Sequence, residues 1–167
     1  MKVIFLDLDG VLNSRAYDRT RNWAELTYID ETRLELVKEI VDATDAKIVF
    51  TSTWRADWDK DPSLRDEDGR YIADTFARYG LEIYDKTPDL GLNADRGDEI
   101  REWLKSFAEK VDSFVIIDDF VYDWGDMTDN FVKTSQYVGR GLEAEHVQKA
   151  IRILNGCSAN DKRETDI

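Results

Sequence analysis

The segment that decides the fold is Val3-Ile4-Phe5-Leu6-Asp7-Leu8-Asp9-Gly10. Four consecutive apolar residues are followed by two acids, two positions apart, and a glycine. Such an apolar run is typical of a strand buried on both faces of a parallel sheet. The acids then lie at the carboxyl end of the strand, where open α/β sheets bind their ligands. We therefore expect residues 3–6 to form a buried strand that carries a functional loop.

The rest of the chain alternates between strand and helix patterns. Further short apolar runs predict strands at residues 47–50, 81–84, 114–117 and 131–133. Apolar stripes at helical spacing predict helices at residues 30–41, 71–79, 97–110 and 143–154. This alternation indicates a three-layer α/β/α fold around a parallel sheet of about five strands. We expect one domain over residues 1–156 and a polar tail over residues 157–167.

Residues with chemically useful side chains follow three of these strands. The three groups are Asp7 with Asp9, Thr51 with Ser52, and Asp118 with Asp119. Several carboxylates at one sheet edge repel one another unless a cation joins them. Hard oxygen ligands favour Mg²⁺, which binds one or two carboxylates and leaves room for a substrate phosphate. The sequence therefore predicts a magnesium site that bridges the protein and a phosphate group.

This set of residues can carry out phosphate chemistry. A carboxylate can attack phosphorus, and a second acid can protonate the leaving oxygen and then activate water. The hydroxyls of Thr51 and Ser52 could hold the phosphoryl oxygens. A basic residue must also offset the transferred charge. Arg96, at the start of the helix near residue 97, is our first choice, and Lys86 is its rival.

These residues resemble the motifs of the haloacid dehalogenase-like (HAD) superfamily. Asp7-Leu8-Asp9-Gly10-Val11-Leu12-Asn13 is similar to the first motif. Thr51 resembles the second motif, Arg96 the third, and the pair Asp118-Asp119 the fourth. Their order and their positions at strand ends also match, across residues 3–119. The resemblance implies a Rossmann-like α/β fold and phosphatase chemistry.

The resemblance also implies a role for each matching residue. Asp7 would be the nucleophile and a magnesium ligand, and Asp9 the general acid/base with its backbone carbonyl on the metal. Thr51 would bind the phosphoryl group, with Ser52 helping. Arg96 would stabilise the phosphoryl charge. Asp118 would bind the magnesium ion, and Asp119 would bind it directly or through a water molecule.

The substrate is constrained by the segments between the motifs. Residues 13–30 leave space only for a short flap, so the sequence resembles capless members, which often act on large substrates. Thr51-Ser52-Thr53-Trp54-Arg55 is similar to small capless members associated with RNA repair. A phosphorylated small molecule or a nucleic-acid end is therefore the expected substrate. Trp54 and Arg55 could contact it, or could instead pack the loop and pair with nearby acids.

Composition excludes several classes of function. The net charge is −13, so tight nonspecific binding of nucleic acid is not expected. Only one cysteine, Cys157, and one histidine, His146, are present, which excludes an internal disulfide and a Cys/His zinc site. No apolar run reaches the length of a membrane span. We expect a cytoplasmic protein and leave its oligomeric state open.

Two other functions stay open at this point. Receiver domains also place acids, a Thr or Ser and a Lys on a parallel sheet, although their adjacent acidic pair usually follows the first strand. Here the adjacent pair comes late, which disfavours a phosphorylatable signalling module. A phosphotransferase would use the same groups as a phosphatase, and the choice depends on the access of water.

Overall fold

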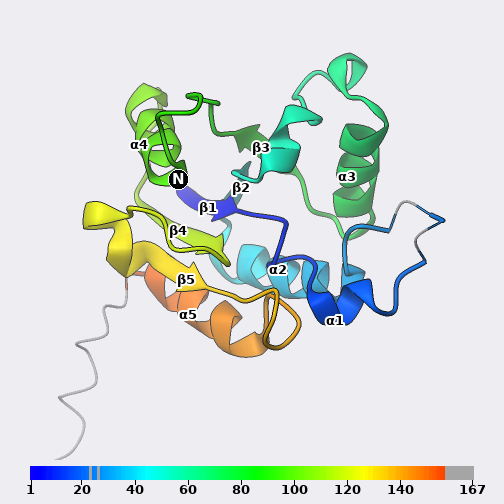
Figure 1. Ribbon diagram of the computed structural model, residues 1–167. Helices are drawn as coiled ribbons and strands as arrows, with labels where there is room; N and C mark the ends of the chain where they lie inside the picture. Colours follow the sequence, from blue (N-terminus) through cyan, green and yellow to red (C-terminus); the bar gives the residue numbers. More distant parts are fainter. Residues whose placement is uncertain (23, 26, 157–167) are drawn as a thin grey trace, which may run out of the picture.

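The described residues form a sheet of five parallel strands (Figure 1). The computed structural model describes residues 1–22, 24–25 and 27–156. The strands are β1 (Lys2–Leu6), β2 (Lys47–Phe50), β3 (Ile83–Lys86), β4 (Ser113–Asp118) and β5 (Phe131–Lys133). Their order across the sheet is β3-β2-β1-β4-β5, so β1 lies at the centre. The predicted fold class is confirmed.

Helices cover both faces of the sheet. The α-helices are α1 (Arg15–Asp18), α2 (Glu31–Thr44), α3 (Glu67–Arg78), α4 (Arg96–Ser106) and α5 (Ala144–Leu154). Three short 3-10 helices are η1 (Thr53–Ala56), η2 (Pro62–Leu64) and η3 (Gly125–Asn130). Helices α2 and α5 lie side by side against one face, and α4 lies on the other (Figure 1).

The central strand explains why the opening apolar run is uninterrupted. Successive side chains of a strand point to opposite faces of the sheet. Ile4 and Leu6 belong to the core shared with α2 and α5. Val3 and Phe5 belong to the core shared with α4, where the Phe5 ring packs edge-on against Trp103. Both faces of β1 are therefore buried, and neither set of positions tolerates a polar residue.

The ladder of backbone hydrogen bonds continues one residue beyond the strand ends. Asp7 N–H donates to the Ile117 carbonyl, and Thr51 N–H donates to the Leu6 carbonyl, both at 3.0 Å. At the other edge of β4, Thr134 N–H donates to the Asp118 carbonyl at 3.0 Å. These bonds fix the first residue after each strand, and they bring the residues of the predicted site to one edge of the sheet.

No large cap interrupts the described part of the chain. Between β1 and α2 it contains only the four-residue helix α1 and loops. Between β2 and β3 it contains η1, η2 and α3. None of the described helices has the length and apolar character needed to cross a membrane.

Several element boundaries differ from the prediction. Helix α4 ends at Ser106 rather than at residue 110, because Phe107 takes an extended backbone conformation and stacks on Trp103 at 4.4 Å between ring centroids. Strand β3 begins at Ile83 rather than at residue 81, because Leu81 N–H still donates to Phe76 in the turn that ends α3.

Further differences concern the segment after β2 and the last helix. The polar, Asp-rich composition of residues 55–69 predicts a loop, but these residues contain part of η1, all of η2 and the start of α3. His146 is half-buried in the first turn of α5, where its Nδ1 accepts a hydrogen bond from the Glu143 backbone. Cys157 and the predicted tail lie outside the described residues.

Candidate active site

Three carboxylates meet at the carboxyl edge of the central strands. Asp7 follows β1, Asp118 ends β4, and Asp119 comes next in the chain. One oxygen of each lies within 4.8 Å of the others. Asp118 is fully buried, Asp7 is 5% exposed and Asp119 is half-buried. The structure thus brings together three of the four acids expected to hold a metal through a side chain or a carbonyl.

Arg96 is the basic residue in this cluster. Its Nη1 lies 3.1 Å from Asp7 Oδ1 and 2.5 Å from Asp118 Oδ2. Arg96 is the first residue of α4, directly after the N-cap residue Asp95, so the start of the helix fixes its position. The ring of Tyr122 lies 5.2 Å from the guanidinium carbon, at the distance of a cation–π contact.

Lys86, the rival of Arg96, points elsewhere. Its ammonium group donates to the backbone carbonyls of Arg55 and Trp58, at 3.1 and 2.6 Å. It also lies 3.4 Å from a carboxylate oxygen of Asp59. Lys86 therefore secures the segment after β2, and only Arg96 of the two reaches the acid cluster.

Burial makes the acid cluster electrostatically unfavourable without a further cation. Desolvation raises the pKa of Asp7 from 3.8 to about 7, although the Arg96 guanidinium opposes this rise. Desolvation also raises the pKa of Asp118 and of Asp119. If all three carboxylates are ionised, the guanidinium of Arg96 balances one of them, and two formal negative charges remain in the cluster. A divalent cation that prefers oxygen ligands fits this arrangement of donors.

The two hydroxyl residues after β2 behave differently. Burial raises the pKa of Asp7, and the nearby Ser52 side chain partly opposes this rise. The Thr51 hydroxyl is buried and has no hydrogen-bond partner among the described residues. Both side chains are inaccessible to solvent at the floor of the site. Ser52 is therefore the better placed of the two to act on Asp7.

Asp9 lies on the exposed side of the cluster. Its Oδ1 accepts a hydrogen bond from Asn13 Nδ2 at 2.8 Å, and its Oδ2 accepts one from Trp54 Nε1 at 3.0 Å. The side chain of Trp54 is thus engaged with Asp9. Arg55 pairs with Glu99 at 2.6 Å and donates to the carbonyls that follow β2.

A tight turn brings the loop after β1 against Asp119. Gly10 has φ +70°, a conformation that favours glycine. A Cβ atom built on Gly10 would lie 2.3 Å from Asp119 Oδ2. The Thr134 hydroxyl donates to the Gly10 carbonyl at 2.7 Å and holds the turn in place. Gly10 is therefore required both by the turn and by the closeness of the acid.

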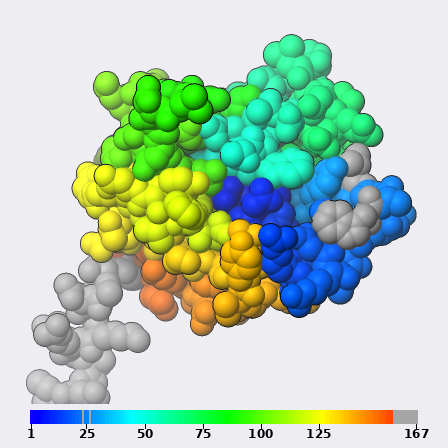
Figure 2. Space-filling model, in the orientation of Figure 1, coloured from blue at the N-terminus to red at the C-terminus, as the bar shows by residue number. Residues whose placement is uncertain are grey.

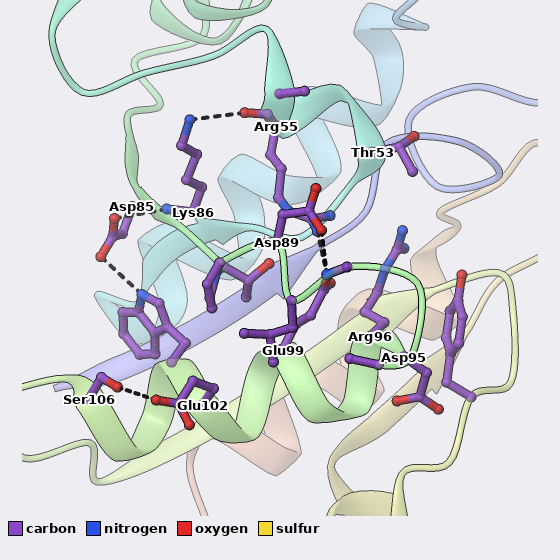
Figure 3. A pocket seen from close by; sticks show the side chains of 18 of the residues that line it. Thr53, Arg55, Asp85, Lys86, Asp89, Asp95, Arg96, Glu99, Glu102 and Ser106 are labelled. Carbon is purple, nitrogen blue, oxygen red and sulfur yellow. Dashed lines mark hydrogen bonds and ion pairs between the residues drawn. The ribbon is translucent and has the colours of Figure 1, made fainter.

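The site opens at the surface beside a large cavity. In Figure 2 the first loop, in dark blue, is visible at the centre of the face between the surrounding segments. A cavity of about 1200 Å³ adjoins Arg96, between η1, the loop of residues 87–95 and α4 (Figure 3). Its wall combines cations such as Arg55 with the acids Asp89 and Glu99. The space suits a substrate much larger than phosphate.

A known family model matches most of the chain, including the site residues. The family model for the HAD domain in Swiss Army Knife RNA repair proteins matches residues 3–147. The chain belongs to this family. The match spans every motif that suggested the HAD superfamily, and HAD domains are generally those of hydrolases and phosphatases. Searches among curated proteins and solved structures found no match.

Three residues of this HAD domain site were not assigned a role from the sequence. They are Asn13 beside Asp9, Tyr122 over Arg96, and Thr134 on the Gly10 turn. Asn13 follows Gly10 by three residues and accepts its backbone N–H at 2.9 Å, a local pattern that could have been recognised. Tyr122 and Thr134 reach the site through the fold, and no local pattern identifies them.

Proposed function

We propose that this HAD domain is a Mg²⁺-dependent phosphomonoester hydrolase with Asp7 as its nucleophile. The observation that carries the proposal is the buried Asp7 carboxylate, paired with Arg96 at 3.1 Å and grouped with Asp118 and Asp119. Asp9 lies two residues further on and is exposed. In this proposal Asp7 is the nucleophile, Asp9 the acid/base and Arg96 the phosphoryl-binding cation.

The first half of the reaction transfers the phosphoryl group to Asp7. A carboxylate oxygen of Asp7 attacks phosphorus, and the bond from phosphorus to the ester oxygen breaks. The leaving oxygen keeps the electron pair and takes a proton from Asp9. Arg96 offsets the negative charge on the phosphoryl oxygens throughout. The products are an alcohol and an aspartyl-phosphate.

The second half returns Asp7 to its starting state. Asp9, now a carboxylate, accepts a proton from water while the water oxygen attacks phosphorus. The bond between phosphorus and the Asp7 oxygen breaks, and inorganic phosphate leaves. Asp9 is protonated again, so one residue serves as acid and then as base.

The metal would be held by residues already in contact. Asp7, Asp118 and Asp119 would supply carboxylate oxygens, and Asp9 its backbone carbonyl. When bound, Mg²⁺ would balance the charge of the carboxylates and of the phosphate. The fit rests on three oxygens within 4.8 Å and on the charge that Arg96 leaves uncompensated.

For the substrate we propose a phosphorylated nucleotide or nucleic-acid end. The family description concerns RNA repair proteins, and the described residues hold no large cap over the site. The net charge of −13 opposes long polyanions, so recognition would be confined to the terminal nucleotides. A phosphorylated small molecule is the competing substrate, because the cavity beside Arg96 would also accept one.

The test is phosphate release from an aryl phosphate with Mg²⁺ and with EDTA. Asp7→Asn should lower kcat by about 10³-fold or more, because removal of a nucleophile leaves only binding and charge effects. Asp112→Asn, a change at an exposed acid beside the N-terminus, is the matched control and should be active. Equal activity of Asp7→Asn and wild type would refute the nucleophile.

Two further measurements define the intermediate and the substrate. Mass spectrometry of rapidly quenched wild-type protein should find phosphate on the peptide that contains Asp7. Oligonucleotides with 3′- or 5′-phosphates should then be compared with phosphorylated metabolites. A kcat/KM that is higher for every metabolite than for every oligonucleotide would contradict the proposed substrate class.

A further inference from the structure

Both oxygens of the Asp9 carboxylate are bound, although Asp9 is exposed. Asn13 Nδ2 donates to Oδ1 at 2.8 Å, and Trp54 Nε1 donates to Oδ2 at 3.0 Å. An exposed carboxylate usually turns freely about its side-chain bonds. Two bonds from separate segments, one on each oxygen, fix the direction of this carboxyl group.

The two donors are themselves held in place. Asn13 Oδ1 accepts the backbone N–H of Gly10 at 2.9 Å, so its amide cannot turn away without loss of that bond. Trp54 lies in η1, packs against the main core and contacts the Tyr28 ring at 4.8 Å between centroids. Tyr28 in turn meets Tyr71 of α3 edge-on. Asp9 is thus connected to the rigid part of the domain.

The chemistry of the donors suits an acid that changes its protonation state. An indole N–H can only donate, and the Asn13 amide nitrogen can only donate as well. Each carboxylate oxygen offers two acceptor positions, so one position on each oxygen is not used by these two donors. The geometry therefore fixes the direction of the Asp9 carboxyl group without using all of its acceptor positions.

We propose that Trp54 and Asn13 are positioning residues that hold Asp9 for proton transfer to the leaving oxygen. This inference rests on the proposed function, since it assigns to Asp9 the acid role described above. Neither residue exchanges a proton or bonds to phosphorus. Their contribution is the orientation of the acid, and a small error of placement at a reacting group slows the reaction strongly.

The test compares two esters that differ in their need for an acid. The leaving group of an activated aryl phosphate departs as an anion, whereas that of an alkyl phosphate must be protonated. kcat/KM reports on the steps up to the departure of the leaving group, so it isolates the acid role from later hydrolysis. Asp9→Asn provides the reference, with an expected loss of about 10²–10⁴-fold on the alkyl ester.

Trp54→Phe is the main variant, because phenylalanine keeps an aromatic ring and removes the N–H donor. We expect kcat/KM to fall about 10-fold or more on the alkyl phosphate and to change less than about 3-fold on the aryl phosphate. Asn13→Ala should show the same selectivity, and it tests the idea by a second route if Trp54→Phe does not fold.

Trp103→Phe is the matched control. It removes an indole N–H that donates to Asp85 Oδ2 at 2.9 Å, in the core on the α4 face. The ratio of the two kcat/KM values should be the same for Trp103→Phe and wild type. Equal losses on both esters for Trp54→Phe and Asn13→Ala would show a structural role and overturn the inference. Wild-type protein inactive on both esters would refute the proposed function itself.

Discussion

The Gly10 turn lies directly against Asp119, and Gly10→Ala is the perturbation that tests what this closeness does. A Cβ atom at this position would lie 2.3 Å from Asp119 Oδ2 and 2.6 Å from Asp119 Cβ. Heavy atoms do not approach so closely, so the side chain or the loop must move. Displacement of Asp119 would remove one of the three carboxylates proposed to hold Mg²⁺.

Gly10→Ala should have two separate effects, one on stability and one on Mg²⁺ binding. The first is conformational, because an L-residue at φ +70° is destabilised by about 1–2 kcal/mol. The second is the displacement of Asp119, which should weaken Mg²⁺ binding by about 10–100-fold, the range found when support for metal ligands is lost. Gly156→Ala should show the first of these alone, since Gly156 has φ +72° and no atom of the described residues lies within 4 Å of its Cβ position.

The assay is titration calorimetry with Mg²⁺, together with urea unfolding in EDTA. Both variants should lose about 1–2 kcal/mol of unfolding free energy. Only Gly10→Ala should lose Mg²⁺ affinity, and Asp119→Asn should lose a similar amount. If Gly10→Ala binds Mg²⁺ as tightly as Gly156→Ala does, then Asp119 is not a ligand or the loop relaxes, and the reasoning is refuted.

Three further predictions concern the charges and the turn. Arg96→Ala should destabilise the metal-free protein by about 3–5 kcal/mol, because it leaves Asp7 and Asp118 buried without a partner. The same substitution should abolish turnover. Lys86→Ala is the control in the same unfolding and phosphate-release assays, and it should keep turnover. Because burial raises the pKa of Asp7 from 3.8 to about 7, the unfolding free energy in EDTA should fall by on the order of a few kcal/mol as the pH rises between these values. Asp7→Asn should flatten this pH dependence. A wild-type unfolding free energy that rises over the same pH range would contradict the prediction. Thr134→Val removes the hydroxyl that donates to the Gly10 carbonyl, so the melting temperature should fall by an amount equivalent to about 1–3 kcal/mol.

The sheet and its functional edge could be predicted because the signals are local. The run Val3–Leu6 needs no partner to be recognised, since a strand buried on both faces must be apolar throughout. The acids and hydroxyls directly after β1, β2 and β4 then fall on one edge, because parallel strands end together. In the structure, Asp7 and Asp118 meet at this edge and Ser52 lies close to Asp7.

Element ends were harder to predict, because they depend on contacts across the fold. The apolar stripe of α4 continues through Phe107 and Val111, and both pack against the second core. The helix nevertheless ends at Ser106, because Phe107 reaches Trp103 from an extended backbone. An apolar stripe in the sequence indicates which residues are buried, and residues can stay buried after the helix has ended.

Whether Arg96 or Lys86 reaches the acid cluster depends on the distance from each side chain to the carboxylates, and the sequence does not give these distances. Both cations follow or precede loops at the same edge of the sheet, so composition favours neither. The N-cap Asp95 begins α4 one residue before Arg96 and directs that side chain between Asp7 and Asp118. Lys86 ends β3, one strand farther from the acids, and the carbonyls after β2 lie closer to it.

Trp54 shows how a residue can have a role that neither sequence interpretation contained. The sequence indicates that Trp54 either contacts the substrate or packs the loop. In the structure the ring does pack, against Tyr28, while its N–H reaches Asp9 across 45 positions of the chain. An indole has an apolar ring and a single donor, so one residue can join the core to an exposed acid. A phenylalanine would provide only the first function, and this difference is what the comparison of alkyl and aryl esters measures.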